Sequence, residues 1–342
     1  MPRRDATGLE VTAASDAAVL AWDAFMDAYA AFQPTIPDHL KALLAADGTM
    51  PLAHTLRAAL MMLAGKRELV PLARTSAAEA VRLAAGATRR EALHAEAVER
   101  WTGDDVDAAT RCWELILALE PRDLLALKLA QFAHFYAGDT RAMQRSVEQV
   151  ADAWDDSVPR YGRYLGVRAF ALEEQGEIAR AEQTGREAVG RAPDDAWAIH
   201  AVAHCLETRG AAAEGCAWLD ATTDDWTGAG TMDGHLRWHR AIFALEHAGP
   251  EAVLADFDDA IQMRGSEEYL DLCNDVALLQ RLELRGLDVG DRWAAIADRL
   301  ELRARDRMLA FCDVHWALGL AAAGRDAALE SLLEGMAGAA EA

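Results

Sequence analysis

The sequence predicts an all-α fold, a solenoid of about seven to eight helix–turn–helix repeats. The first observation is composition: Ala, Leu, Glu, Asp and Arg dominate the 342 residues and only nine are proline, which favours helix. The second is a period: glycine-containing turn signals recur at spacings of 38, 35, 38, 34, 39, 37 and 38 residues. The turn glycines are Gly65, Gly103, Gly138, Gly176, Gly210, Gly249, Gly286 and Gly324.

Each interval between these glycines has room for two helices. The first helix is predicted in "DAAVLAWDAFMDAYAAF", residues 16–32. Each turn glycine is expected to take the left-handed conformation that lets a helix reverse, because glycine does so without steric cost. The clearest unit spans 162–195, where Ala181, Ala188 and Pro193 follow Gly176 by 5, 12 and 17 residues. These offsets resemble the tetratricopeptide repeat, and the residues from Gly103 to Pro121 repeat the scheme with one extra residue.

No linker rich in Gly, Pro or Ser interrupts the repeats. We therefore expect a short flexible lead over residues 1–15 and a single continuous helical-repeat domain over 16–335. One connection, "DATTDDWTGAGTMDGH" at 220–235, is long and polar. Connections of this kind either cover a site or form a surface excursion between helices, and the sequence leaves both open.

The charge narrows the class of partner. With 34 Lys and Arg against 56 Asp and Glu, the net charge of −22 repels phosphate backbones and anionic membranes, so we expect no nucleic-acid and no membrane partner. The five cysteines form no CxxC pair and the N-terminus has no apolar signal core, which predicts a cytoplasmic protein. A small-molecule ligand or a partner protein remains, and the oligomeric state stays open, a homodimer included.

Two pairs of histidines are the candidate functional feature. In "AWAIHAVAHCLETRG", residues 196–210, Ile199, Val202, Ala203 and Leu206 form an apolar stripe. A second stripe on the same helix carries Trp197, His200, His204 and Glu207. The next unit, "GHLRWHRAIFALEHAG", repeats the pattern with His235, His239 and Glu246. Because side chains at i and i+4 lie one above the other, parallel first helices are expected to bring the four imidazoles near one another.

Carboxylates follow in the next two units. Asp275 and Asp313 stand at the same distance before their turn glycines, so we expect them to close the histidine cluster; His315 is near Asp313 in sequence but on another side of the helix. A Glu also recurs three residues before the glycine in four units, which indicates a structural carboxylate that bonds a neighbouring repeat. These glutamates are Glu173, Glu207, Glu246 and Glu283.

Three chemistries fit this constellation. Imidazoles with carboxylates from facing helices can hold a divalent metal, zinc or iron, with His200, His204, His235 and His239 as ligands. Without metal, His–Asp or His–Glu pairs act as acid–base catalysts, and the same groups can simply bind a small polar molecule. We take His200, His204, His235, His239, Asp275 and Asp313 as candidate catalytic residues, and Trp197, Glu207, Trp226, Glu246 and His315 as candidate ligand-binding residues.

The sequence thus favours an enzyme of unassigned class, acid–base or metal-assisted. No HExxH motif supports the metal version. The alternative is a protein-interaction scaffold that binds a partner peptide in the concave groove, with the histidines structural.

At "DDAWAIHAVAHCLETRG" the chain resembles the tetratricopeptide-repeat protein 38 family. The resemblance extends to "GHLRWHRAIFALEHAG", "DLCNDVALLQRLELRG" and "FCDVHWALGLAAAGR", and covers residues 20–325. It implies a helical-repeat solenoid and marks seven side chains as typical of the family, without assigning their roles: His200, His204, His235, His239, Asp275, Asp313 and His315. This chain departs from the family in its short N-terminal lead and in ending soon after the last motif.

Overall fold

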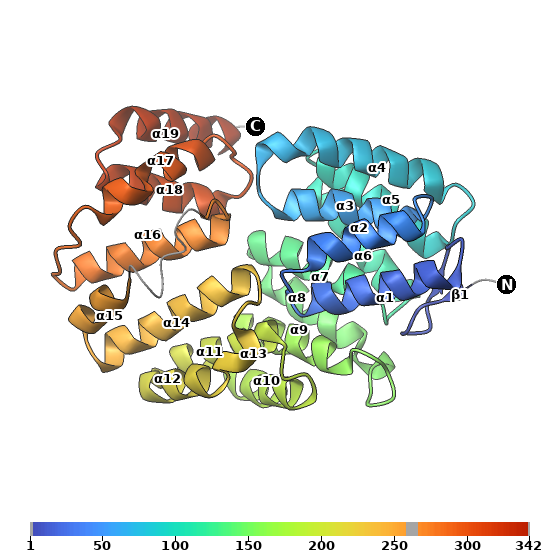
Figure 1. Ribbon diagram of the computed structural model, residues 1–342, viewed down its shortest axis with the longest axis horizontal. Coiled ribbons are helices and arrows are strands. Elements are labelled where there is room, and N and C mark those ends of the chain that lie inside the picture. The colour runs from blue at the N-terminus through green and yellow to red at the C-terminus, as the bar shows by residue number, and fades with distance from the viewer. Residues whose placement is uncertain (1–2, 258–265, 341–342) are drawn as a thin grey trace. The chain divides into compact units, whose positions relative to one another are not determined.

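The computed structural model describes residues 3–257 and 266–340 and consists of helical hairpins, so the predicted all-α, tetratricopeptide-like repeat fold is confirmed (Figure 1). Residues 1–2 of the expected lead and 258–265 of the expected domain lie outside the described residues. The chain divides into two compact units. Unit 1 comprises residues 1–63, 69–209 and 222–230, and unit 2 comprises 64–68, 210–221 and 231–342. The single continuous domain over 16–335 therefore stays a prediction.

Unit 1 is a series of antiparallel helix pairs. In it α3 packs on α4, α5 on α6, α7 on α8 and α9 on α10. Three pairs of first helices also pack on one another, namely α3 on α5, α7 on α9 and α9 on α11. Its helices are α1 (Asp16–Ala30), α2 (Ile36–Ala46), α3 (Pro51–Leu63), α4 (Val70–Ala84), α5 (Arg89–Thr102), α6 (Val106–Leu119), α7 (Leu124–Tyr136), α8 (Thr140–Gln149), α9 (Tyr161–Glu174), α10 (Ile178–Arg191), α11 (Ala196–Thr208) and α13 (Thr223–Trp226). The 3₁₀ turn η2 (Ala151–Ala153) follows α8, and η1 (Arg67–Leu69) crosses the boundary at residue 68 between the two units.

Side-chain caps fix where these helices begin. Asp105, Asp123, Asp139 and Asp195 each accept a hydrogen bond from a backbone N–H in the first turn of the helix that follows. Thr88 and Glu91 form a complete capping box at the start of α5. Aspartate before an apolar run is therefore the recurring start signal of the hairpin helices of unit 1.

The turn glycines behave as predicted, with one exception. Gly65, Gly138, Gly176, Gly210, Gly249, Gly286 and Gly324 all have positive φ, between 65° and 95°. Gly103 is the exception, since its φ is −85° and the next residue, Asp104, takes the left-handed conformation at 73°. The reversal after α5 thus occurs one residue later than the sequence predicts.

The N-terminal lead is more ordered than expected. β1 (Arg3–Arg4) pairs antiparallel with β2 (Glu10–Val11), and the Asp5 carboxylate accepts hydrogen bonds from Thr7 and the Leu9 amide. Thr12 then donates twice to Glu91 of α5. The flexible lead predicted over residues 1–15 is therefore replaced, over 3–11, by a hairpin whose Leu9 and Val11 are buried.

Unit 2 continues the same architecture. Its helices are α12 (Ala212–Ala221), α14 (Thr231–His247), α15 (Pro250–Asp256), α16 (Tyr269–Leu284), α17 (Arg292–Arg303), α18 (Ala310–Ala322) and α19 (Asp326–Ala340). One apolar core joins α14 to α19, centred on residues such as Leu278, Ile296 and Trp316. At Gly319 a Cβ would lie 2.4 Å from Leu300, so α18 approaches α17 more closely than any larger residue permits.

The polar stretch 220–235 is not one long loop. It contains the end of α12, the short helix α13 and the start of α14. Trp226 of α13 is only 1% exposed, so it does not line an open surface. The sequence misses α13 because four residues are too few to show a helical period.

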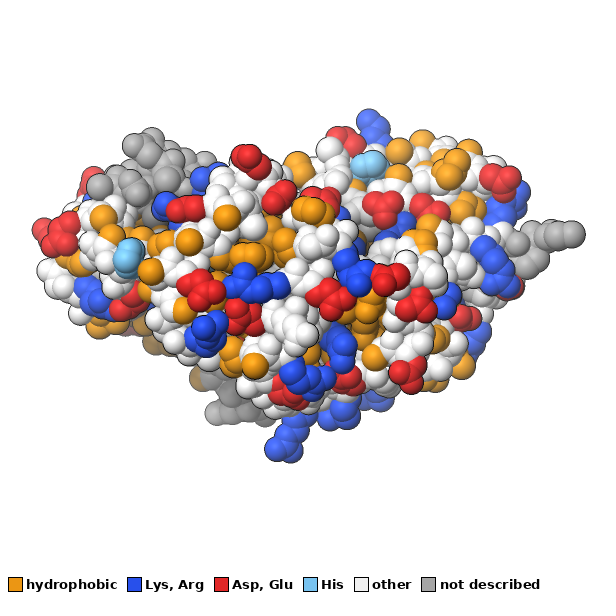
Figure 2. Space-filling model, turned by 90° about the horizontal axis from the view of Figure 1, so that it is seen from below, with side chains coloured by type: hydrophobic (Ala, Val, Ile, Leu, Met, Phe, Trp, Pro, Cys, Tyr) orange, Lys and Arg blue, Asp and Glu red, His pale blue; other side chains and the backbone are white. Residues whose placement is uncertain are grey.

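Within residues 3–257 and 266–340, no helix combines the length and the apolar character that crossing a membrane requires. The face drawn in Figure 2 carries acidic and basic side chains interspersed among apolar ones. The acidic excess of the chain is thus dispersed on this face.

Candidate functional site

Helix α11 presents the predicted stripes. Asp195 caps it by accepting from the amides of Trp197 and Ala198, at 3.1 and 3.2 Å. Ile199, Val202 and Leu206 are fully buried, which confirms the apolar stripe. The second stripe faces α9: His200 is 3% exposed, and the imidazole of His204 is 26% exposed.

Two carboxylates of α9 converge on His204. Its Nδ1 lies 3.4 Å from Oε2 of Glu173, and Glu173 is 9% exposed. Oε1 of Glu173 accepts from the Thr208 hydroxyl at 3.4 Å. Potential ligand atoms of Glu173, Glu174 and His204 all lie within 4.8 Å of one another. Unit 1 therefore contains a His–Glu–Glu cluster, of which the sequence singled out only His204 as a site residue.

Burial and charge set the proton affinities in this cluster. Burial raises the pKa of Glu174 above its ordinary value, and the charge of Glu173 adds to that rise. Burial alone would lower the pKa of His204, but the hydrogen bond to Glu173 and the nearby carboxylates outweigh it and leave the pKa raised. The charges of Glu173, Glu174 and His204 therefore influence one another strongly, because solvent screens buried groups poorly.

Aromatic rings wall the same side of α9 and α11. Phe170 lies 4.7 Å from Trp197 between ring centroids and 5.6 Å from both His200 and His204. The His200 and His204 rings are 4.3 Å apart in an edge-to-face arrangement. Phe170 excludes water from one side of the imidazoles, which strengthens their electrostatic interactions with the carboxylates.

Sequence reasoning misses one further residue of unit 1. Lys128 of α7 extends its ammonium over the rings of Phe32, Tyr29 and Trp197, at 4.4, 5.4 and 5.9 Å from their centroids. Burial lowers its pKa to about 8, with the charge of Asp195 opposing the shift and that of Arg163 adding to it. The sequence offers one indication of Lys128, which is that lysine is rare in this chain. Of its 34 Lys and Arg residues, only Lys41, Lys66 and Lys128 are lysines.

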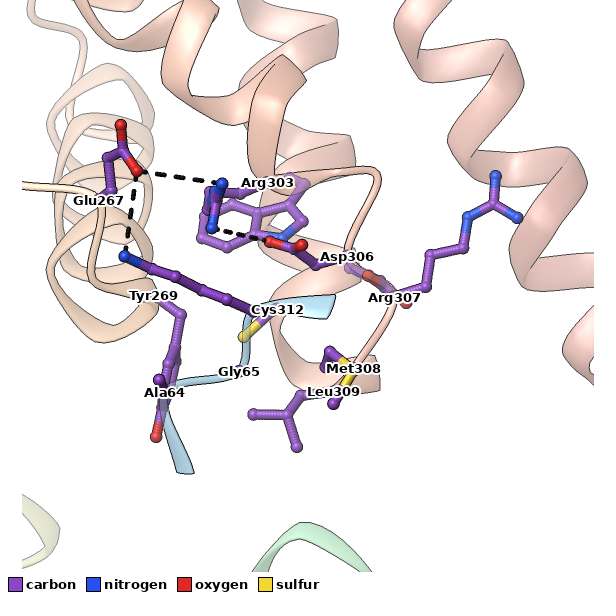
Figure 3. Close-up of a pocket in the computed structure, with 13 residues that line it drawn as sticks. Ala64, Gly65, Glu267, Tyr269, Arg303, Asp306, Arg307, Met308, Leu309 and Cys312 are labelled. Carbon is purple, nitrogen blue, oxygen red and sulfur yellow. Dashed lines mark ion pairs between the residues drawn. The ribbon is translucent and has the colours of Figure 1, made fainter. Parts of the chain in front are cut away.

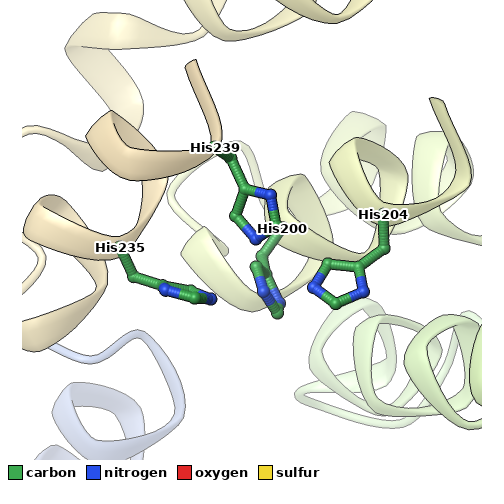
Figure 4. Close-up of side chains that lie close together, drawn as sticks. All are labelled: His200, His204, His235 and His239. Atoms are coloured by element: carbon green, nitrogen blue, oxygen red, sulfur yellow. The ribbon is translucent and has the colours of Figure 1, made fainter. Parts of the chain in front are cut away.

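The second histidine pair, His235 and His239, belongs to unit 2. Figure 4 draws and labels all four histidines. On α14 the rings of His235 and His239 are 4.7 Å apart, and His235 stacks on Trp238 at 5.4 Å. Nδ1 of His235 lies 3.0 Å from the side-chain oxygen of Asn274, so it donates and the Nδ1–H tautomer is favoured. The pair is thus held in place from α16.

Asp275, next to Asn274 on α16, is 1% exposed. Burial raises its pKa to about 7, the charge of Asp271 adds to the rise and that of Arg299 opposes it. A carboxyl with a pKa near neutral can give or take a proton at that pH, and the acid–base role expected of Asp275 stays a prediction.

Asp313 lies in the wall of a separate hollow of unit 2 (Figure 3). Here Arg303, 4% exposed, lies 3.2 Å from Asp306 and 3.9 Å from Glu267, and Lys66 is 3.9 Å from the same Glu267. The space left between these side chains is about the size of one water molecule. The hollow therefore accommodates a water rather than a substrate.

The other expected site residues lie elsewhere. Glu207 is exposed, and Glu246 is exposed and pairs with Arg285 of the following hairpin, as expected of a structural glutamate. His315 bonds the Phe311 carbonyl through Nδ1 at 2.7 Å. Since His200 and His204 belong to one unit and His235 and His239 to the other, the joint four-histidine site stays a prediction.

No protein-family model matches the chain. Among solved structures it is similar to a tetratricopeptide repeat protein from Parabacteroides merdae, with 15% identity over 80% of this chain and all 100% of that chain, and a TM-score of 0.48. It is also similar to the TPR domain of P58(IPK), with 13% identity over 94% of this chain and 90% of that chain, and a TM-score of 0.25. The fold assignment depends on this chain's own hairpins.

Proposed function

We propose that this helical-repeat protein binds a divalent cation through Glu173, Glu174 and His204, and uses it to bind and polarise a small polar molecule. The observation that carries the proposal is the convergence of these three side chains within 4.8 Å in unit 1. On the phrases quoted from the sequence, we also propose that the chain is a relative of the tetratricopeptide-repeat protein 38 family.

The donor set suits a borderline metal. Imidazole nitrogen with carboxylate oxygens is typical of zinc and of non-haem iron or manganese sites, which leave coordination positions for a ligand. A cation also relieves the repulsion between adjacent carboxylates, whose mutual charge raises the pKa of Glu174. When bound, the ion would supply Lewis-acid polarisation of a ligand oxygen.

The surrounding residues would hold the ligands in place. Thr208 donates to the second oxygen of Glu173, which leaves Oε2 directed toward His204. Phe170 contacts both imidazoles of α11 and limits their rotation. Such supporting contacts orient metal ligands and raise affinity.

Replacing His204 with alanine is expected to weaken zinc binding at this cluster, because it removes the nitrogen ligand. Calorimetric titration of chelator-treated protein with zinc should show affinity lowered more than about 10-fold in His204→Ala and in Glu173→Gln. The matched control is His247→Ala, since His247 is exposed at the end of α14. Wild-type protein that takes up no zinc, or a His204→Ala variant that binds as wild type does, contradicts the proposal.

A second candidate, a surface for a partner protein, has one specific observation in its favour. On α18, in the last hairpin, Phe311, Val314 and Leu318 are 40%, 51% and 42% exposed and lie at helical spacing on one side. An exposed apolar stripe of this kind favours association, and a second copy of the chain is the simplest occupant.

If the chain dimerises through α18, Leu318→Asp is expected to shift it to monomer, because it places a charge in the apolar interface. Light scattering coupled to size exclusion measures the mass directly. Leu20→Asp, at a leucine of α1 that is 70% exposed, is the control and should leave the mass unchanged. A wild-type protein that is monomeric at high concentration rules this surface out as a dimer contact.

A further inference from the structure

Lys128 is an unusual choice at its position. The chain uses arginine almost exclusively, and Lys128 is one of only three lysines. Arginine remains protonated in proteins, whereas lysine can lose its proton and act as a nucleophile. At a site whose only task is a cation–π contact, arginine serves at least as well.

The contacts of Lys128 are with rings. Its ammonium lies over Phe32, Tyr29 and Trp197, and within the described residues it forms no hydrogen bond or ion pair. Lys128 as a residue is partly exposed. Burial nevertheless disfavours the charged form, and lowers the pKa of Lys128 to about 8.

Phe32, whose ring is the nearest to the Lys128 ammonium, has a strained backbone. Phe32 has a φ of 55°, in the left-handed region that bulky residues rarely occupy. This conformation lets its ring stack on Trp197, at 5.6 Å and 15° between planes, directly beside the Lys128 ammonium. Strain of this kind persists at functional sites, where the surroundings fix it.

We propose that Lys128 is a nucleophilic amine that condenses with the carbonyl carbon of a small aromatic aldehyde, with Phe32, Tyr29 and Trp197 as the surface that receives the ring. The uncharged amine forms a C–N bond to the carbonyl carbon. The nitrogen then loses its two protons, the carbonyl oxygen leaves as water, and an imine results, with no oxidant or reductant consumed. The net charge of −22 favours an uncharged aldehyde over an anionic one.

The electrostatic neighbours of Lys128 are few. Asp195, the cap of α11, favours the ammonium, and Arg163, which lies 3.8 Å from Asp195, favours the neutral amine. The chemistry needs none of the three proposed metal ligands, so the imine and the zinc site can fail independently.

The test traps the imine. Intact protein is incubated with benzaldehyde and cyanoborohydride, and the reduced adduct is mapped by mass spectrometry at Lys41, Lys66, Lys128 and the N-terminal amine. Lys128 is expected to react at least about 10-fold faster than exposed Lys41, since an ordinary lysine has a pKa of about 10.4. Its rate should reach half its maximum near pH 8, as the pKa of about 8 requires.

Two variants distinguish the contribution of the Lys128 amine from that of the surrounding aromatic rings. Lys128→Arg keeps the positive charge and should remove the fast adduct. Phe32→Ala keeps the amine and should slow its labelling, with helicity checked by circular dichroism. The proposal is overturned if Lys128 in wild-type protein is labelled no faster than Lys41. This comparison does not depend on any variant folding correctly. A Phe32→Ala rate equal to wild type overturns the proposal as well.

Discussion

Replacing Asp123 with alanine is expected to lower the free energy of unfolding by about 3–5 kcal/mol, since it leaves a buried charge without its partner. Asp123 is 2% exposed, and one oxygen accepts from Arg90 at 2.8 Å and from His94 at 3.0 Å. Arg90 and His94 are themselves buried, at 4% and 0% exposure. The other oxygen caps α7 through the Ala126 amide. Chemical denaturation at pH 7 measures the change.

Asp139→Ala is the matched control. Asp139 caps α8 by the same bond, to the Ala142 amide at 2.9 Å, but holds no buried cation. Its loss is expected to cost only about 1 kcal/mol. Equal effects of the two substitutions would show that Asp123 acts as a cap alone.

The Asp123 contribution also depends on pH. Burial alone would raise the pKa of this carboxyl, but His94 and Arg90 outweigh it and hold the pKa below its usual range. The contribution is therefore complete above the unfolded pKa of about 3.9 and is lost as pH falls below it. Asp123→Ala should lack this part of the acid dependence.

Replacing Asp275 with asparagine is expected to stabilise the protein above neutral pH. The folded pKa of about 7 lies above the unfolded value, so the fold favours the protonated carboxyl and loses stability as pH rises toward 7. Asparagine resembles the protonated form. The gain over wild type should grow by about 1.4 kcal/mol per pH unit between pH 4 and 7, as an upper limit, and level off above that.

Denaturation curves at pH 5, 6, 7 and 8 test this expectation. Asp326→Asn, at an exposed position in the first turn of α19, is the control. A stability difference for Asp275→Asn that does not change with pH would contradict a near-neutral carboxyl. It would also remove the basis for an acid–base role at this residue.

The repeat architecture could be predicted because its signals are local. Turn glycines, aspartate caps and apolar stripes each act within one or two helical turns, and the stripe of Ile199, Val202 and Leu206 is buried as predicted. The errors are local as well. After α5 it is Asp104, and not Gly103, that takes the left-handed conformation. Aspartate tolerates this conformation better than most residues, and the spacing of the glycines alone does not reveal which of the two residues adopts it.

The candidate site was only partly predictable because it joins distant segments. The spacing of His200 and His204 showed that they share a face, but not that Glu173 and Glu174 of α9 meet His204. A Glu stands at the position of Glu173 in four units, and this recurrence favoured a structural role. Glu246, one of the four, does form an ion pair with Arg285 of the following hairpin. Lys128 lies in a different hairpin from both Phe32 and Trp197, so no helical period connects it with the rings around it.

The central claim is that Glu173, Glu174 and His204 hold a divalent cation. Anomalous diffraction at the zinc edge, from crystals of protein loaded with one equivalent of zinc, tests it most directly. We expect the strongest peak between these three side chains, about 2.0–2.2 Å from the His204 nitrogen and the carboxylate oxygens. Zinc bound elsewhere on the chain with no peak at this cluster, or no bound zinc at all, would contradict the claim.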